Sequence, residues 1–457
     1  MTELIFSFLI VISFVFISGF VFSTIFLKDN IDAINFGEFG LLGIVILTYI
    51  AFLIHFFFPL NTKINLVIIL FFVVYFIFNY KTYLKKNLFE NKIIFFSILI
   101  VILMTVKYRP NEDYGFYHLP YIINVISEKV IFGLSNIQPQ YAWNSSWLNF
   151  SAVLNLPYIG IKGTQLSNSL LYLFIIIFFF IEITKKNKNI YSLSKFYILF
   201  LCFYTLIKFS RISEHGFDFP VNFFLLISIF YFIKMLETKK KDQIEKNFKL
   251  LIILITLSLT IKLTSFIGPF IVFYSIYHLY EERIKIKKIL PVSAFCLSFL
   301  FFWFIQQFIY SGCFVPFFEF TCIKSVSWSD TEISKVLSGA TGAINKSYYQ
   351  YKGILSETEY GQNFNWVTTW FLRHKVEFLE HFAAFIIPIL FFLFLNMSFL
   401  NKKNKKIKFI NEKKKIILIL FVLITFGLIV WFIRSPVIRF GIPYLYCFTF
   451  LIVFLLI

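Results

Sequence analysis

Apolar runs of about 18 to 25 residues recur along the whole sequence, and this is the length that crosses the roughly 30 Å hydrocarbon core of a bilayer. Of the 457 residues, 59% are hydrophobic and 68 are Phe, which is more than a soluble domain can cover with polar surface. Backbone polar groups inside a bilayer must be bonded internally, so such runs fold as helices. We therefore predict an all-α fold, a polytopic transmembrane helical bundle.

The apolar runs predict about 13 spans. The number depends on residues 249–280, where Lys262, Gly268 and Pro269 interrupt the apolar pattern. This segment is either one span or a short helical pair, and a pair fits the alternation of the loops better. The predicted spans are 3–27, 38–60, 64–80, 92–109, 168–184, 192–209, 219–236, 249–261, 264–280, 289–310, 379–399, 415–433 and 439–457.

Lysine-rich connections between the spans indicate the orientation, because short cytoplasmic loops carry an excess of Lys and Arg. Segments 81–86, 185–189, 239–249, 282–288 and 401–415 all fall on the same side, which we expect to be the inside. These loops also explain the net charge of +19, so we do not infer a nucleic-acid partner.

The alternation of the loops divides the chain into five parts. These are N-terminal transmembrane helices (1–109), an outer loop (110–167), central transmembrane helices (168–310), a second long outer loop (311–378) and C-terminal transmembrane helices (379–457). Both outer loops are long and rich in aromatic residues, which predicts folded pieces at the membrane interface.

Two local features of the outer loops lead to structural predictions. Residues 118–133 predict an interfacial helix, with Pro120 in its first turn and Gly133 at its C-terminal cap. The five cysteines include no CxxC pair, which excludes a zinc or thioredoxin-like pattern. Cys313 and Cys322 can form a disulfide in an oxidising compartment, but we favour two unpaired thiols.

Glu112 and Asp113 follow the fourth predicted span directly, which places them at the bilayer surface. A partly solvated carboxylate there can act as a general base, and stabilisation of a helix N-terminus explains the pair equally well. His118 can join Asp113 at a metal ion only if a turn intervenes, because five residues on a helix point about 140° apart. An interfacial histidine without metal is the simpler interpretation.

Three further charged sites lie between spans on the predicted outer side. Glu214 and Asp218, four residues apart, can share a helical face, or one of them can pair with Arg211 within a loop. Lys262 interrupts an apolar run, at a cost of roughly 2.5–3.5 kcal/mol at mid-membrane, so it faces a cavity or an anion unless it extends to the interface. Arg434 and Arg439 can bind phosphate through their planar guanidinium groups, or contact lipid headgroups.

The sequence resembles the polytopic glycosyltransferases of the GT-C superfamily, which use lipid-linked sugars and carry an acidic motif in an outer loop directly after a span. More specifically, it is similar to a bacterial family of glycosyltransferase-like membrane proteins whose substrates are mostly unassigned. The resemblance covers about residues 109–441 and rests on five short stretches. These are EDYGFYHLPYI (112–122), NSSW (144–147), IKLTS (261–265), SGCFVP (311–316) and SPVIRFG (435–441).

The resemblance implies a membrane glycosyltransferase of the bacterial cytoplasmic membrane, active on its external face in cell-envelope synthesis. Its donor is a sugar linked to polyprenyl phosphate, and its acceptor is a glycan or a lipid. Asp113 or Glu112 is then the base of an inverting transfer or a ligand of a divalent cation. The sequence contains no P-loop, GxSxG or HExxH motif, so nucleotide hydrolysis, serine esterase chemistry and zinc protease chemistry have no support.

Arg439, Arg434 and Lys262 are the donor-phosphate ligands that the resemblance implies, with Glu214 and Asp218 as a secondary acidic site. Near-attack geometry predicts that the Arg439 guanidinium and the Asp113 carboxylate lie within roughly 6–12 Å. Two other functions stay open at this point. One is a transporter or flippase of lipid-linked glycans, and the other is an O-antigen polymerase or ligase.

Overall fold

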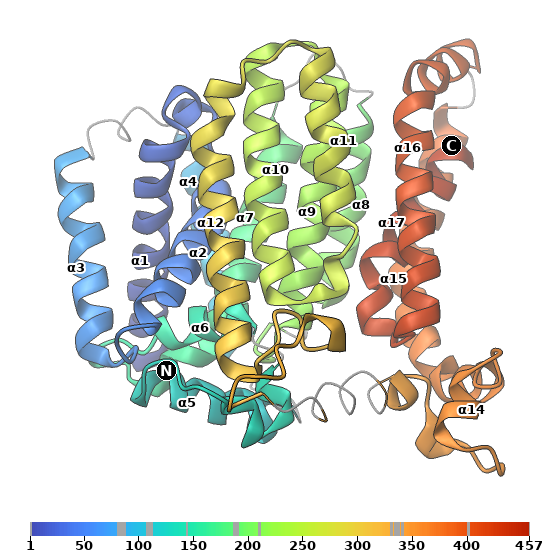
Figure 1. The fold of residues 1–457 in the computed structure, drawn as a ribbon. Helices are drawn as coiled ribbons and strands as arrows, with labels where there is room; N and C mark the ends of the chain where they lie inside the picture. The colour runs from blue at the N-terminus through green and yellow to red at the C-terminus, as the bar shows by residue number, and fades with distance from the viewer. Residues whose placement is uncertain are drawn as a thin grey trace.

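The computed structural model describes residues 2–79, 88–106, 113–142, 145–185, 192–208, 212–329, 332, 339, 342–399 and 403–456. No β-strand forms among these residues. They contain two isolated β-bridges, one between Leu156 and Gly160 and one between Cys313 and Cys322. Helices make up most of the described chain (Figure 1). The prediction of an all-α fold is confirmed.

Nine helices in the described part of the chain are long and apolar enough to cross a membrane. The chain is therefore an integral membrane protein, as its composition predicts. The nine helices are α1 (Thr2–Phe26), α2 (Phe36–His55), α3 (Thr62–Asn79), α7 (Ser167–Thr184), α9 (Asp218–Glu237), α11 (Gly268–Glu281) together with the turn η8 (Leu263–Ser265) before it, α12 (Ile286–Ser311), α16 (Lys403–Arg434) and α17 (Ile438–Leu456).

The four remaining predicted spans also fall on helices, but length and composition alone do not mark these helices as spans. α4 (Leu88–Thr105) and α8 (Leu193–Lys208) contain apolar stretches of fewer than 18 residues. α10 (Lys241–Ile261) and α15 (Val367–Phe399) begin before the predicted spans, and the N-terminal parts outside those spans carry charged side chains. Residues 367–378, which we predicted as outer loop, therefore belong to α15.

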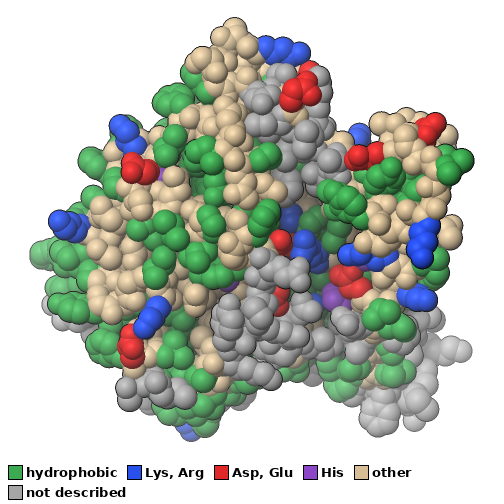
Figure 2. All heavy atoms as spheres, turned by 90° about the horizontal axis from the view of Figure 1, so that it is seen from below, with side chains coloured by type: hydrophobic (Ala, Val, Ile, Leu, Met, Phe, Trp, Pro, Cys, Tyr) green, Lys and Arg blue, Asp and Glu red, His purple; other side chains and the backbone are tan. Residues whose placement is uncertain are grey.

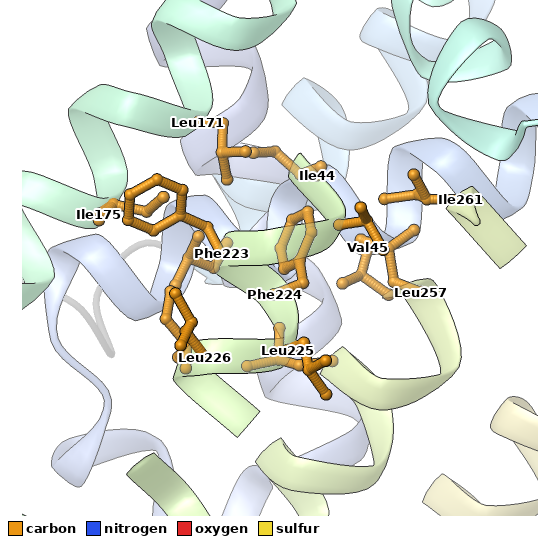
Figure 3. Packing of buried hydrophobic residues seen from close by; sticks show 14 of the residues in the cluster. Ile44, Val45, Leu171, Ile175, Phe223, Phe224, Leu225, Leu226, Leu257 and Ile261 are labelled. Atoms are coloured by element: carbon orange, nitrogen blue, oxygen red, sulfur yellow. The ribbon is translucent and has the colours of Figure 1, made fainter. Parts of the chain in front are cut away.

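The centre of the bundle is formed by α2, α7, α9 and α10, whose apolar side chains interdigitate (Figure 3). These side chains are buried away from lipid and water, and they pack at the density of a protein interior. The labelled members of this buried cluster are Ile44, Val45, Leu171, Ile175, Phe223, Phe224, Leu225, Leu226, Leu257 and Ile261.

α1 and α2 approach each other closely because glycines stand at their contact. A Cβ atom on Gly19 would lie 1.7 Å from the carbonyl oxygen of Phe39, and one on Gly43 would lie 1.9 Å from that of Val15. Small residues allow such backbone contact between membrane helices, where van der Waals packing drives association. An alanine at either position would separate the two helices.

Short helices gather at one end of the bundle, while the connection between α11 and α12 lies at the other (Figure 1). The gathered helices are α5 (Leu119–Ser127), α6 (Ser146–Val153) and α14 (Glu357–Gly361). The basic segment 282–288 lies in the α11–α12 connection, so it is opposite to these short helices.

The predicted helix at 118–133 is shorter than expected. Pro120 lies in its first turn as predicted, but α5 ends at Ser127 rather than at Gly133. Beyond it, the backbone N–H of Val130 donates to the carbonyl oxygen of His55 at 3.1 Å. This contact with α2 replaces helical hydrogen bonds, and Gly133 (φ 68°) instead begins the next turn, 134–136.

Residues 249–280 form two helices. α10 ends at Ile261 and α11 begins at Gly268, and Lys262 lies in the extended break between them. The prediction of a helical pair is confirmed.

Cys313 and Cys322 form a disulfide, so the prediction that both thiols are unpaired is wrong. Gly312 adopts a left-handed conformation (φ 72°) that turns the chain out of α12. The backbone N–H of Ile323 then donates to the carbonyl oxygen of Gly312 at 2.9 Å, which closes a hairpin and brings the two sulfurs together.

Candidate functional site

Four charged side chains meet where four separate elements begin or break. Asp113 precedes a π-helical turn, η3 (Tyr114–His118), and Asp218 is the first residue of α9. Lys262 lies in the break between α10 and α11, and Arg439 is the second residue of α17. Polar groups of the backbone and of side chains can both be accommodated at helix ends, because the backbone groups there lack helical partners. Here the ends of four elements lie close together.

Asp218 is the centre of this group. Its Oδ2 lies 3.1 Å from Nε of Arg439, and its Oδ1 accepts a hydrogen bond from Nζ of Lys262. Arg439 also faces Asp113, with 3.8 Å between Nη2 and Oδ2. The predicted proximity of Arg439 and Asp113 is thus confirmed, but the two groups are in contact rather than roughly 6–12 Å apart.

Aromatic and amide groups hold the two cations in place. The ammonium of Lys262 lies over the ring of Phe440 at 3.6 Å, and over that of Phe217 at 5.1 Å. Asn222 donates from Nδ2 to the carbonyl oxygen of Arg439 at 3.0 Å, which fixes the start of α17 against α9. Cation–π contact stabilises a cation that has lost part of its hydration shell.

This charged group is open to a ligand on one side. The side chain of Arg439 is 50% exposed, whereas those of Asp218 and Lys262 are 26% and 21% exposed. Figure 2 shows the end of the bundle that carries the short helices, with a hollow between the main body and the C-terminal helices. In this view acidic, basic and histidine side chains lie around the edge of the hollow.

Two buried histidines lie beside the charged group. The ring of His118 is 5.7 Å from that of His215 and 4.8 Å from that of Phe217. Burial lowers the pKa of both imidazoles to about 3, so both are neutral at pH 7. Among the described residues, both ring nitrogens of His118 lack a hydrogen-bond partner.

The residues around Asp113 do not fit a divalent cation. His118 packs against rings, and the Asp113 carboxylate faces a guanidinium. Within the described ranges, no three His, Cys, Asp or Glu side chains are grouped closely enough to hold a metal ion. The pairing of His118 with Asp113 at a metal is therefore not supported by the geometry.

A model of one protein family matches residues 1–446, which includes every residue of this site. The chain belongs to the family described as Domain of unknown function (DUF8201). No curated protein and no solved structure matches the chain. The site of this DUF8201 protein is accordingly interpreted from its own geometry.

Two other predicted residues of the DUF8201 chain, Arg434 and Glu214, lie on different segments from the four charged residues. Arg434 is exposed at the end of α16, where its charge acts on Lys346. Glu214 precedes α9 in a loop, so it does not share a helical face with Asp218. The backbone carbonyl of Glu214 accepts a hydrogen bond of 2.6 Å from Asn168. Asp218, predicted as a secondary site, instead bridges both cations, while Glu112 lies outside the described residues.

Sequence reasoning missed a second wall of the site, on α15. His374 and Glu377 form a pair there, with 2.7 Å between Nδ1 and Oε2. Nε1 of Trp370, one turn earlier on α15, donates to the carbonyl oxygen of Pro436 just before α17, so this part of α15 lies beside the start of α17. The charges of Glu377 and Arg439 also act on each other. The spacing of His374, Glu377 and His381 puts all three on one helical face, and this periodicity was visible in the sequence.

Proposed function

We propose that this DUF8201 protein is an inverting membrane glycosyltransferase that uses a sugar linked to polyprenyl phosphate. The observation that carries the proposal is a group of four charged side chains at one end of an integral membrane bundle. In this group Arg439 contacts Asp113 and Asp218, and Lys262 contacts Asp218. Such a group offers fixed cations for a lipid phosphate and a carboxylate beside them. The GT-C-like resemblance assigns the same two roles to Asp113 and Arg439.

The two cations would bind the phosphate of the donor. Phosphate oxygens can accept hydrogen bonds from the same N–H groups that contact the carboxylates. Arg439 is half exposed, so its guanidinium nitrogens can reach a phosphate in the hollow. Fixed cations stabilise the charge that develops on the leaving phosphate, which is usually the largest catalytic contribution. Asp218 keeps both cations oriented when no donor is bound.

Asp113 would accept the proton of the acceptor hydroxyl. Its contact with Arg439 places a carboxylate next to the phosphate position, so an acceptor bound there lies close to the anomeric carbon of the donor. The hydroxyl oxygen then attacks this carbon with inversion. General-base catalysis of this kind typically contributes 10²–10⁴-fold.

We further propose that the site faces the external side of the bacterial cytoplasmic membrane and that all 13 or so predicted segments span it. The Cys313–Cys322 disulfide supports this orientation, because disulfides persist in oxidising compartments. The lysine-rich segment 282–288 lies at the opposite end, as the positive-inside rule requires. A glycan or lipid acceptor would approach from the external side.

The test is a transfer assay with the purified protein in lipid vesicles. Decaprenyl-phosphate-linked hexoses and pentoses serve as donors, and a lipid extract of the source membranes supplies acceptors. Release of decaprenyl phosphate should depend on Asp113 and Arg439. We expect Asp113→Asn to lower the rate by about 10²-fold or more, because the amide cannot accept the proton.

Arg439→Lys keeps the charge but loses the planar fork, so it should impair donor use. Arg434→Lys is the matched control and should retain the wild-type rate, because Arg434 lies outside the site. Movement of unchanged donors across the vesicle membrane without sugar transfer would instead identify a flippase. Wild-type rates in both Asp113→Asn and Arg439→Lys would refute the proposed roles.

A further inference from the structure

The hollow has a second wall that the proposed roles of Asp113 and Arg439 do not use. It is formed by the first part of α15, which carries His374 and Glu377, and Figure 2 shows basic, acidic and histidine side chains around the hollow. Nε1 of Trp370 donates to the carbonyl oxygen of Pro436 at 2.6 Å. Because Pro436 comes three residues before Arg439, this bond fixes α15 against the start of α17.

His374 lies one turn beyond Trp370, with 5.5 Å between the two ring centroids. Its Nδ1 contacts Oε2 of Glu377 at 2.7 Å, and only 7% of the residue is exposed. No hydrogen bond to its other nitrogen, Nε2, is made by the residues that the structure describes. A carboxylate on Nδ1 orients an imidazole and stabilises its protonated form, which leaves Nε2–H available to donate.

Glu377 is suited to this orienting role. Burial raises its pKa, but the hydrogen bond from His374 and the positive charges of His374, His381 and Arg439 have the larger effect, so the pKa is lowered overall. Glu377 is therefore anionic at neutral pH, and its side chain is 34% exposed. The carboxylate of the pair is therefore partly open to solvent, whereas the imidazole of His374 is buried.

The charged groups around the pair come from three other elements. The charges of Arg439 (α17) and Glu377 act on each other, and Asp113 beside η3 contacts Arg439. Lys208 of α8 contacts Nε2 of His381, one turn further along the same face, at 3.3 Å. Because the charges of Glu377 and Arg439 act on each other, a phosphate bound to Arg439 would lie within electrostatic range of the His374–Glu377 pair.

We propose that His374 is a catalytic acid that protonates the leaving phosphate, with Glu377 as its positioning residue. The inference rests on the proposed function and adds a second proton-transfer residue to it. A sugar-linked phosphate carries one negative charge, and the lipid phosphate released from it carries two unless it gains a proton, since its second ionisation has a pKa of about 6. Protonation during bond cleavage therefore limits the charge that must develop.

The proposed step balances as follows. The O–H bond of the acceptor breaks and its proton passes to Asp113, while the oxygen forms a bond to the anomeric carbon. The bond from this carbon to the phosphate oxygen breaks, and its electron pair stays on the oxygen. That oxygen takes the proton from Nε2 of His374. Solvent then removes the proton from Asp113 and returns one to His374.

The experiment measures the pH dependence of decaprenyl phosphate release from decaprenyl-phosphate-linked sugars, with the full-length protein in vesicles. The wild type should show a bell-shaped profile whose basic limb reports loss of the His374 proton. His374→Gln should lower the rate by about 10²-fold at its optimum and abolish the basic limb. Glu377→Gln should move this limb to lower pH, because a neutral amide no longer stabilises the imidazolium.

His381→Gln is the matched control on the same helical face, and its profile should keep both limbs. A His374→Gln variant that retains a two-limbed profile, or loses less than threefold in rate, overturns the assignment. If His374→Gln does not fold, an unshifted basic limb in Glu377→Gln overturns it instead. Absence of sugar transfer by the wild type would refute the proposed function itself, which is a different outcome.

Discussion

Replacing Asp218 by Asn should destabilise the protein, because one carboxylate neutralises two cations that do not lie fully in water. At an effective dielectric constant of 20, the 3.1 Å contact with Arg439 corresponds to about 5 kcal/mol of Coulomb energy. The Arg439 side chain is half exposed, so solvent screening reduces this contribution to about 1 kcal/mol.

The contact of Asp218 with Lys262 contributes more, since both side chains are mostly buried. Removing one partner of a fully buried pair costs about 3–5 kcal/mol, and partial exposure places this pair at the lower end. We therefore expect Asp218→Asn to lower the free energy of unfolding by about 3–5 kcal/mol in total. The loss should be visible as a shift in an SDS unfolding titration in mixed micelles.

A double-mutant cycle isolates the contribution of Lys262. In Asp218→Asn/Lys262→Met no unpaired ammonium remains, so the double variant should recover about 2 kcal/mol of the loss. Asp242→Asn is the control, because Asp242 also lies in the first turn of a helix but is exposed, and it should change stability by less than about 1 kcal/mol. Additive effects of the Asp218 and Lys262 substitutions would show that the pair is not coupled and refute the argument.

Three further predictions concern pH, the disulfide and topology. Because burial lowers the pKa of His118 and His215 to about 3 from the ordinary 6.5, the stability due to each is fully present above pH 6.5 and is lost as the pH falls toward 3. At pH 5 each should cost up to about 2 kcal/mol in an SDS titration, and a curve without pH dependence in this range would contradict their burial. Replacing both Cys313 and Cys322 by Ser should destabilise the protein by about 2–3 kcal/mol, the chain-entropy value for so short a loop, and an unchanged midpoint would contradict the disulfide. Single cysteines at 401–415 of a Cys-free variant should resist an impermeant thiol reagent in intact cells, and their labelling would reverse the orientation.

The helices and their approximate limits follow from the sequence, because the requirement to bond the backbone within an apolar layer acts on each segment by itself. Each of the 13 predicted segments falls on a helix, and the break at Lys262 lies where a charge and Gly268 interrupt the apolar run. The resemblance to GT-C enzymes also implied one site for Asp113 and Arg439, and the two side chains are in contact. Ends of elements were less predictable, as the early end of α5 shows, because backbone contacts with α2 decide it.

Only the tertiary structure decided which charges meet. Arg434 and Arg439 are equivalent as sequence features, yet only Arg439 reaches the carboxylates, because α17 begins against Asn222 of α9. The central position of Asp218 and the His374–Glu377 pair likewise depend on which helix ends lie side by side. Hydrophobicity places each helix in the apolar layer, but it does not specify which helices are neighbours. Neighbours are fixed by side-chain fit and by pairing of the few polar groups, and these interactions join residues far apart in the chain.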